Sequence, residues 1–183
     1  MDFVTHLPNS FVHTVIWVIC DCLTKFVHFI ALPTRFTVED LGHRFSIEIC
    51  RLHGIPKSII SDRDPLFLSK FWKELFKTQG TQLKYNTSYH PETDGQTEVV
   101  NHTLESYLRC FVIDHPRRWY KFLHLAEFWH NSTFHSAIQM APFQALYGRT
   151  PPSIPDFMPG STTIGTLYEV MKLLELNLQK AKQ

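Results

Sequence analysis

Residues 37–64 read TVEDLGHRFSIEICRLHGIPKSIISDRD, and the pattern of hydrophobic residues changes once along this stretch. Hydrophobic residues first recur every three or four positions, which predicts an amphipathic helix that begins after Thr37 and ends at Gly54. After Pro56 comes a brief apolar strand that ends at Asp62. An acidic residue just past a buried strand lies where open α/β sheets place their ligand sites. The hydrophobic residues of the predicted helix are Val38, Leu41, Phe45, Ile49 and Leu52.

The segments on both sides extend this α/β pattern. On the N-terminal side, residues 2–5, 13–20 and 25–32 are predicted strands, and their short connections favour antiparallel neighbours. On the C-terminal side we expect a helix, a strand, a mobile polar loop and three more helices. The order predicts a mixed sheet with helices on its faces. The C-terminal segments are residues 69–78, 82–85, 86–95, 96–113, 116–129 and 141–147.

The composition describes one globular domain. Of the 183 residues, 44% are hydrophobic and 19% are charged, which excludes a disordered chain. The longest apolar run near the start, residues 15–20, is too short to span a membrane, and no signal peptide is expected. The net charge of +1 argues mildly against tight, stand-alone DNA binding. The fifteen Phe and four Trp predict an aromatic core, to which the helix at 69–78 contributes Phe71, Trp72, Leu75 and Phe76.

The four cysteines form no CxxC pair. We expect buried, reduced thiols of an intracellular protein, with a zinc site as the alternative. The cysteines are Cys20, Cys22, Cys50 and Cys110.

Glu98 is a second acidic residue at an informative position, near the start of the helix predicted at 96–113. It lies on the side opposite the hydrophobic stripe of this helix, and therefore faces either the open end of the sheet or water. Taken alone, an aspartate after a strand and a glutamate on a polar helix face are more often solvated than catalytic. The stripe consists of Val100, Leu104, Tyr107, Leu108 and Phe111.

Longer motifs around these carboxylates resemble the integrases of gypsy-type LTR retrotransposons. The run RLHGIPKSIISDRD at 51–64 resembles the segment around the second catalytic aspartate of that family. The run YHPETDGQTE at 89–98, continuing to Asn101, resembles the segment around its catalytic glutamate, and MDF at 1–3 resembles the end of its first core strand.

The spacing of the carboxylates and two later motifs also resemble this family. Asp62 and Glu98 have 35 residues between them, as in the D,D-35-E signature of retroviral-type integrases. AEFWHN at 126–131 and PFQALYGR at 142–149 extend the similarity, which runs from residue 1 to about residue 150.

The resemblance implies an RNase H-like fold, a five-stranded mixed sheet flanked by helices, with the first strand truncated in this chain. Asp2, Asp62 and Glu98 would converge at one edge of the sheet, with their carboxyl groups within about 8 Å, and hold two Mg²⁺ or Mn²⁺ ions. The activity implied is that of a polynucleotidyl transferase in DNA integration, which trims the 3′ ends of the element and transfers them to target DNA.

Three other aspartates are rivals for the catalytic assignments. Asp64 lies two residues after Asp62 and could point the same way on extended chain, although the 35-residue spacing favours Asp62. Asp94 is interpreted as a residue of the polar loop. Asp21 follows the second predicted strand, and the resemblance places it outside the triad.

The resemblance also suggests contacts with DNA. Tyr89, His90, Gln96 and Thr97 belong to the segment expected to position substrate. Asn101 either lies beside the active site or makes local hydrogen bonds. His102 stands where the family usually has a basic residue, and a neutral imidazole would weaken a phosphate contact there. A basic cluster after Pro116 is interpreted as a solvated helix face, and it consists of Arg117, Arg118 and Lys121.

The domain organisation expected is an integrase core at 1–150, a Pro-rich linker at 151–165 and a C-terminal helix at 166–183 that starts a missing C-terminal region. The family's zinc-binding and small β domains are absent, so we expect a fragment or a degenerate copy. The partners implied are DNA and, in the full-length enzyme, further copies of itself, with no membrane. A nuclear location is expected, although no targeting signal is visible.

Two other functions stay open. The first is a non-catalytic descendant that serves as a DNA- or protein-binding module, although retention of Asp2, Asp62 and Glu98 speaks against it. The second is an RNase H-type nuclease, which would need a fourth carboxylate in the cluster.

Overall fold

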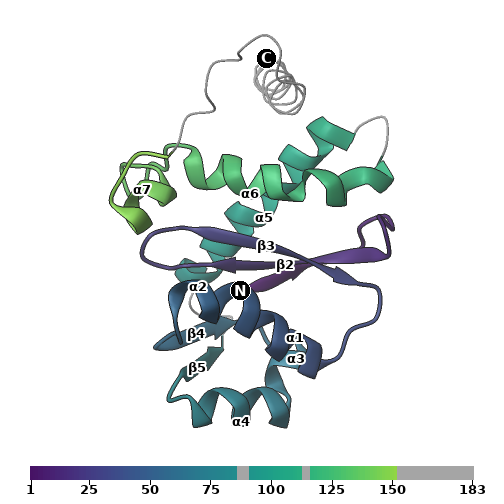
Figure 1. Ribbon diagram of the computed structural model, residues 1–183, viewed down its shortest axis with the longest axis vertical. Helices are drawn as coiled ribbons and strands as arrows, with labels where there is room; N and C mark the ends of the chain where they lie inside the picture. The colour runs from purple at the N-terminus through teal and green to yellow at the C-terminus, as the bar shows by residue number, and fades with distance from the viewer. Residues whose placement is uncertain (86–90, 113–115, 152–183) are drawn as a thin grey trace. The chain divides into compact units, whose positions relative to one another are not determined.

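The computed structural model describes residues 1–85, 91–112 and 116–151, and for residues 91–98, 110 and 111 the backbone alone (Figure 1). The chain packs as two compact units. Unit 1 comprises Met1–Cys20 and His28–Asn101. Unit 2 comprises Asp21–Val27 and the described residues from His102 onward. The predicted linker and C-terminal helix at 152–183 lie outside the described residues, so the predicted domain boundaries stay predictions.

The strands form two hydrogen-bonded ladders. The first has the order β1-β2-β3, with β1 (Asp2–Val4) antiparallel to β2 (His13–Cys20) and β3 (Val27–Pro33) beside β2. The second pairs β4 (Ser58–Ser61) in parallel with β5 (Gln82–Tyr85).

The amino group of Met1 donates a hydrogen bond of 2.8 Å to the carbonyl of Ile60 and so links the first ladder to the second. The described ladders therefore contain three and two strands, and a continuous five-stranded sheet is not shown. β1 has three residues, and no ladder between β1 and β4 is found in the described part of the chain.

The helix predicted from Thr37 to Gly54 is present as three consecutive segments. These are α1 (Val38–Phe45), the π-helical turn η1 (Ser46–Cys50) and α2 (Arg51–His53). Thr37 and Asp40 form a reciprocal capping box at the N-terminus, and Gly54 ends the helix with a φ of 80°.

The π-helical turn changes which residues face the core. Leu41, Phe45 and Ile49 are buried, but Leu52, expected on the same stripe, is half exposed. A π-helical turn accommodates one more residue than an α-helical turn, so the inward face moves one position along the chain. His53, the next residue, is exposed as well, and its ring lies beside that of His28 on β3.

Helices α3 (Pro65–Leu68) and α4 (Lys70–Thr78) connect β4 to β5. The sequence predicted α4 within one residue and missed α3. Gly42 allows α4 to approach α1 closely, since a Cβ atom at this position would lie 2.9 Å from Cδ2 of Leu75.

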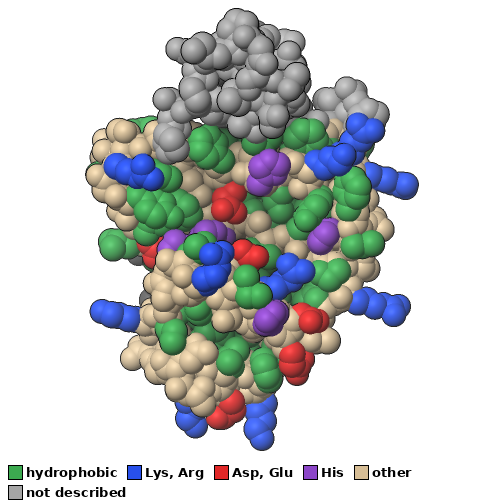
Figure 2. Space-filling view, in the orientation of Figure 1, with side chains coloured by type: hydrophobic (Ala, Val, Ile, Leu, Met, Phe, Trp, Pro, Cys, Tyr) green, Lys and Arg blue, Asp and Glu red, His purple; other side chains and the backbone are tan. Residues whose placement is uncertain are grey.

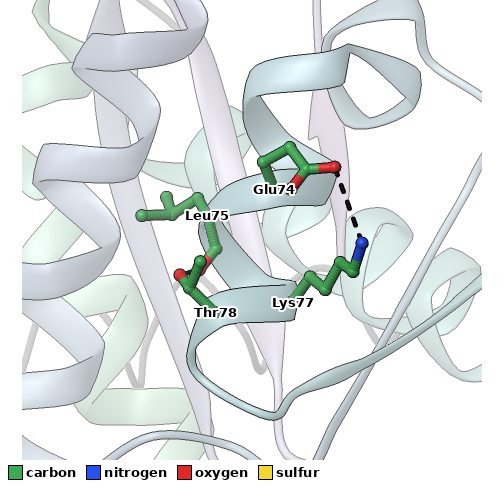
Figure 3. A network of polar contacts seen from close by, with 4 residues as sticks. All are labelled: Glu74, Leu75, Lys77 and Thr78. Atoms are coloured by element: carbon green, nitrogen blue, oxygen red, sulfur yellow. Dashed lines mark hydrogen bonds and ion pairs between the residues drawn. The ribbon is translucent and has the colours of Figure 1, made fainter.

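Leu75 points away from Glu74 and Lys77, which lie 4.0 Å apart as an exposed ion pair (Figure 3). Acidic and basic side chains therefore lie side by side at the end of unit 1 where α4 lies (Figure 2).

The core of unit 1 is aromatic, as the composition predicted. Trp17 and Trp72 are fully buried with ring centroids 6.0 Å apart, and Phe3 stacks on Phe67 at 4.9 Å. The prediction was wrong for Phe71, which is 41% exposed and whose ring lies beside Gly42 of α1, outside the buried cluster. The buried cluster consists of Trp17, Ile30, Leu32, Leu41, Phe45, Ile49, Ile59, Phe67, Trp72 and Phe76.

The remaining helices are α5 (Pro91–Val112), the 3₁₀ helix η2 (Pro116–Phe122), α6 (Leu123–Ser132) and α7 (Pro142–Tyr147). The predicted loop was wrong for residues 91–95, which are helical, and this includes Asp94. Proline suits the first turn of a helix, so Pro91 starts α5 instead of ending a loop. Residues 86–90 lie outside the described part. No described helix is both long and apolar enough to cross a membrane.

Unit 2 contains a buried asparagine whose side chain forms hydrogen bonds with the backbone at the start of β3. The side chain of Asn131, on α6, accepts a hydrogen bond from the backbone N–H of Val27 and donates one to its carbonyl, both at 2.9 Å. The AEFWHN motif thus has a structural role at its last residue. The basic cluster after Pro116 is exposed, as predicted. Cys20, Cys22 and Cys50 form no disulfide, but the expectation that they are buried was wrong, since Cys20 and Cys50 are half-buried and Cys22 is exposed.

Candidate functional site

Asp2 starts β1 and is half-buried. Its Oδ1 atom accepts a hydrogen bond from the backbone N–H of Phe3 at 2.7 Å, and its Oδ2 atom accepts one from Nδ2 of Asn101 at 2.7 Å. Asp2 and Asn101 are 99 residues apart in the chain, so this bond is a tertiary contact between β1 and α5.

Asp62 follows β4 directly and is also half-buried. Burial raises the pKa of the Asp62 carboxyl above its ordinary value, and the nearby negative charges of Asp2 and Asp64 act in the same direction. A hydrogen bond of 3.3 Å from the N–H of Asp64 lowers this pKa in part. The structure therefore brings the carboxylates of Asp2 and Asp62 close enough to affect each other.

Backbone geometry explains this proximity. The Met1 amino group bonds to Ile60, so the start of β1 lies against β4 two residues before Asp62. The ends of two strands that are distant in sequence thereby meet, as open α/β folds require of a ligand site.

Glu98 lies on α5, three residues before Asn101. Residues three apart occupy one face of a helix, so the backbone carries Glu98 on the same face that delivers Asn101 to Asp2. The Glu98 side chain lies outside the described residues, and the expected separation of about 8 Å between the three carboxyl groups stays a prediction.

One of the two polar side-chain atoms of Asn101 has a hydrogen-bond partner among the described residues. Its Nδ2 atom donates to Asp2, but its buried Oδ1 atom finds no hydrogen-bond partner among the described residues. This oxygen and the Asp2 and Asp62 carboxylates make the site rich in acceptors. Oxygen acceptors are the ligands that Mg²⁺ prefers, so the residues present fit such an ion. The described residues include no group of three His, Cys, Asp or Glu side chains that could hold a metal, and that search did not include the Glu98 side chain.

The rival aspartates have local partners. Asp64 caps α3, because its Oδ1 atom accepts a hydrogen bond from the N–H of Leu66 at 2.9 Å. Asp21 accepts hydrogen bonds from the N–H of Thr24 at 2.9 Å and from its hydroxyl at 2.6 Å, which stabilises the turn before β3. The sequence did not reveal the capping role of Asp64, although the Asp-Pro pair at 64–65 is a signal of a helix start.

The predicted DNA contacts are placed only in part. Tyr89 and His90 lie outside the described residues, and for Gln96 and Thr97 the structure describes only the helical backbone. His102 is exposed on α5 in unit 2. Of this group, only Asn101 has a described contact with a predicted catalytic residue.

Curated retrotransposon polyproteins match most of the chain, and two of them illustrate the similarity. They are the Tf2-3 and Tf2-4 transposon polyproteins of Schizosaccharomyces pombe, each 34% identical over 159 residues, which cover 87% of this chain. This chain is homologous to a segment of the Tf2 retrotransposon polyproteins. It spans 12% of the length of these relatives. No protein-family model matches it.

Solved structures share its fold. A chain of the simian T-cell lymphotropic virus intasome, determined with the PP2A regulatory subunit B56 gamma, matches 88% of this chain and 58% of its own length, with a TM-score of 0.65 and 19% identity. The HTLV-2 integrase catalytic core, determined with magnesium, matches 79% of this chain and 93% of its own length, with a TM-score of 0.60 and 16% identity. The fold is therefore that of retroviral integrase catalytic cores, which are RNase H-like.

Proposed function

We propose that this chain is the catalytic core of a gypsy-type retrotransposon integrase of the D,D-35-E group. It would trim the 3′ ends of the element's DNA and join them to target DNA. The observation that carries the proposal is the contact of Asn101 with Asp2 beside Asp62, because it brings the helix that carries Glu98 to the two aspartates.

Asp2, Asp62 and Glu98 would hold two Mg²⁺ or Mn²⁺ ions. When bound, such ions activate the attacking water or 3′-hydroxyl group and stabilise the leaving oxygen. The chain's own part is to position the ligands: Asn101 fixes the Asp2 carboxylate through Oδ2, and the Phe3 N–H fixes it through Oδ1. The raised pKa of Asp62 reflects burial and like-charge repulsion, both of which a cation would offset.

The proposal extends to the complete sheet, the substrates, the oligomeric state and the cellular location. The two ladders would form one five-stranded mixed sheet joined at β1 and β4, as the Met1–Ile60 hydrogen bond supports. DNA ends and target DNA are the substrates, and the full-length enzyme would act as a homo-oligomer in the nucleus. One structural neighbour is part of an intasome, and the HTLV-2 core is known in dimeric and trimeric forms, which supports oligomerisation.

The experiment is a strand-joining assay on branched oligonucleotides that mimic an integration product, with Mg²⁺ or Mn²⁺. We expect weak metal-dependent activity and no efficient paired integration by the 183-residue chain. Asp62→Asn and Glu98→Gln should each reduce the rate by about 100-fold or more, because each removes a charged ion ligand. Asp21→Asn is the matched control, since Asp21 stabilises a turn, and it should keep the activity.

Three outcomes would contradict the proposal. Equal rates for Asp62→Asn and the unaltered chain would exclude the carboxylate site. No joining by a folded chain that still binds Mn²⁺ would favour the non-catalytic binding module. Cleavage of an RNA–DNA hybrid without DNA joining would favour the RNase H-type nuclease.

A further inference from the structure

A pair of histidines lies in unit 1, on elements other than those that carry the proposed carboxylate site. His28 is on β3 and His53 is the last residue of α2. Their Nε2 atoms are 2.8 Å apart, and their ring centroids are 5.1 Å apart with an interplanar angle of 54°. His28 is half-buried and His53 is exposed, so solvent reaches the pair.

The fold brings the two rings together in a defined way. Alternate residues of a strand share a face, so His28 lies on the face of β3 that carries Ile30 and Leu32 into the core. Phe45 and Ile49 pack their helix against the same core. Through the π-helical turn and α2 the same helix runs on to His53, whose exposed ring meets the ring of His28.

We propose that His28 and His53 form a binding site for a borderline divalent transition-metal ion of the Ni²⁺, Cu²⁺ and Zn²⁺ class. Neutral imidazole is a common ligand for these ions. With metal–nitrogen distances of about 2.0–2.1 Å, two nitrogens 2.8 Å apart subtend an angle of about 86° at the ion. This angle matches neighbouring ligands in the tetragonal geometry that Cu²⁺ and Ni²⁺ prefer. With centroids 5.1 Å apart the two Nε2 atoms point at each other, as in an N–H···N hydrogen bond, so both rings would have to rotate before one ion could bind both nitrogens. Tetrahedral Zn²⁺ would also need a nitrogen separation of about 3.3 Å.

The protein supplies two ligands, and solvent completes the coordination. The described residues contain no third His, Cys, Asp or Glu that could join such a site. Cys50, one turn before His53, packs against the core cluster instead. The ligand chemistry separates this site from the carboxylate site, because imidazole selects borderline ions while carboxylates select Mg²⁺. An ion bound here would tie the end of the helix to β3.

Calorimetric titration of Ni²⁺ into the full chain, with millimolar Mg²⁺ present, tests the proposal. His28→Gln and His53→Gln should each weaken one binding component about tenfold or more, because each removes one of two protein ligands. His43→Gln, an exposed histidine on α1, is the matched control and should bind Ni²⁺ like the unaltered chain. Equal Ni²⁺ binding by all three variants would overturn the site.

Two further measurements use other readouts. Ni²⁺ should raise the thermal unfolding midpoint of the unaltered chain and of His43→Gln but not of the two pair variants, whose far-ultraviolet circular dichroism confirms folding. Cu²⁺ should give the visible absorption band of nitrogen coordination, lost in both pair variants. A Cu²⁺ spectrum unchanged by His53→Gln would show that the ion binds elsewhere and overturn the proposal.

Discussion

Two asparagines, one in each compact unit, use their side-chain amides differently. Asn131 in unit 2 satisfies both of its polar atoms on the backbone of Val27. Asn101 in unit 1 donates to Asp2 and leaves its buried oxygen without a partner among the described residues. The first amide is fully paired with the backbone and stabilises the fold, whereas the second holds a carboxylate of the proposed site. Experiments that remove each amide should separate stability from activity.

The largest effect is expected for Asn131→Leu. This change leaves the N–H and carbonyl of Val27 buried without partners and should lower the free energy of unfolding by about 3 kcal/mol. Urea denaturation followed by circular dichroism measures the loss. Asn101→Leu is the comparison variant, and an equal loss of stability for the two variants would remove the distinction between the amides.

A titratable group in unit 2 gives the next largest effect. Burial, followed by the charge of the neighbouring His135, lowers the pKa of His130 to about 4 from its ordinary 6.5. Between pH 4 and pH 6.5 the unfolded chain therefore binds more protons at this histidine than the folded chain does. The stability that neutral His130 contributes is fully present above pH 6.5 and is lost as the pH falls through 4. The loss between pH 7 and pH 5 amounts to about 2 kcal/mol of unfolding free energy.

Urea denaturation of the unaltered chain and of His130→Gln at both pH values measures this contribution. The difference in stability between the two proteins should shrink at pH 5. His124→Gln, which changes an exposed histidine on the same helix, is the control. A pH dependence that is identical in all three proteins would show that His130 is not held neutral.

Asn101→Ala should affect catalysis more than folding. Loss of one half-buried hydrogen bond costs about 1 kcal/mol of stability at most, while release of the Asp2 carboxylate should reduce the strand-joining rate about tenfold. The rate should recover partly at high Mn²⁺ concentration, because a loosely held ligand weakens metal affinity. A rate reduction that excess Mn²⁺ leaves unchanged would argue against positioning of Asp2 by Asn101.

The smallest effect on stability is expected at the exposed N-terminus of α1, where the Thr37 side chain caps the helix. Thr37→Ala removes the capping box with Asp40 and should lower the free energy of unfolding by about 1 kcal/mol. Thr37→Ser keeps the hydroxyl group and should restore most of the loss. Thermal unfolding compares the two variants, and equal destabilisation by both would show that the methyl group, not the cap, stabilises this end.

The sequence predicted those parts of the fold that local chemistry determines. Thr37 and Gly54 bound the helix as expected, and Asp62 lies directly after its strand, because caps, glycines and hydrophobic spacing act over a few residues. The burial of Leu52 and Phe71 was predicted wrongly, since a π-helical turn and the packing of α4 are decided by tertiary contacts. The Asn101–Asp2 bond spans 99 residues, so no local pattern could have specified its geometry.

The extra residue in η1 behaves as an insertion concealed inside a continuous helix. A relative that lacks it would need a one-position gap in an alignment although no loop marks the place. Deletion of a residue there would leave Leu41 and Phe45 in register and rotate everything beyond Ile49, which would move the ring of His53 away from His28. A change in chain length by one residue would thus separate the two imidazoles.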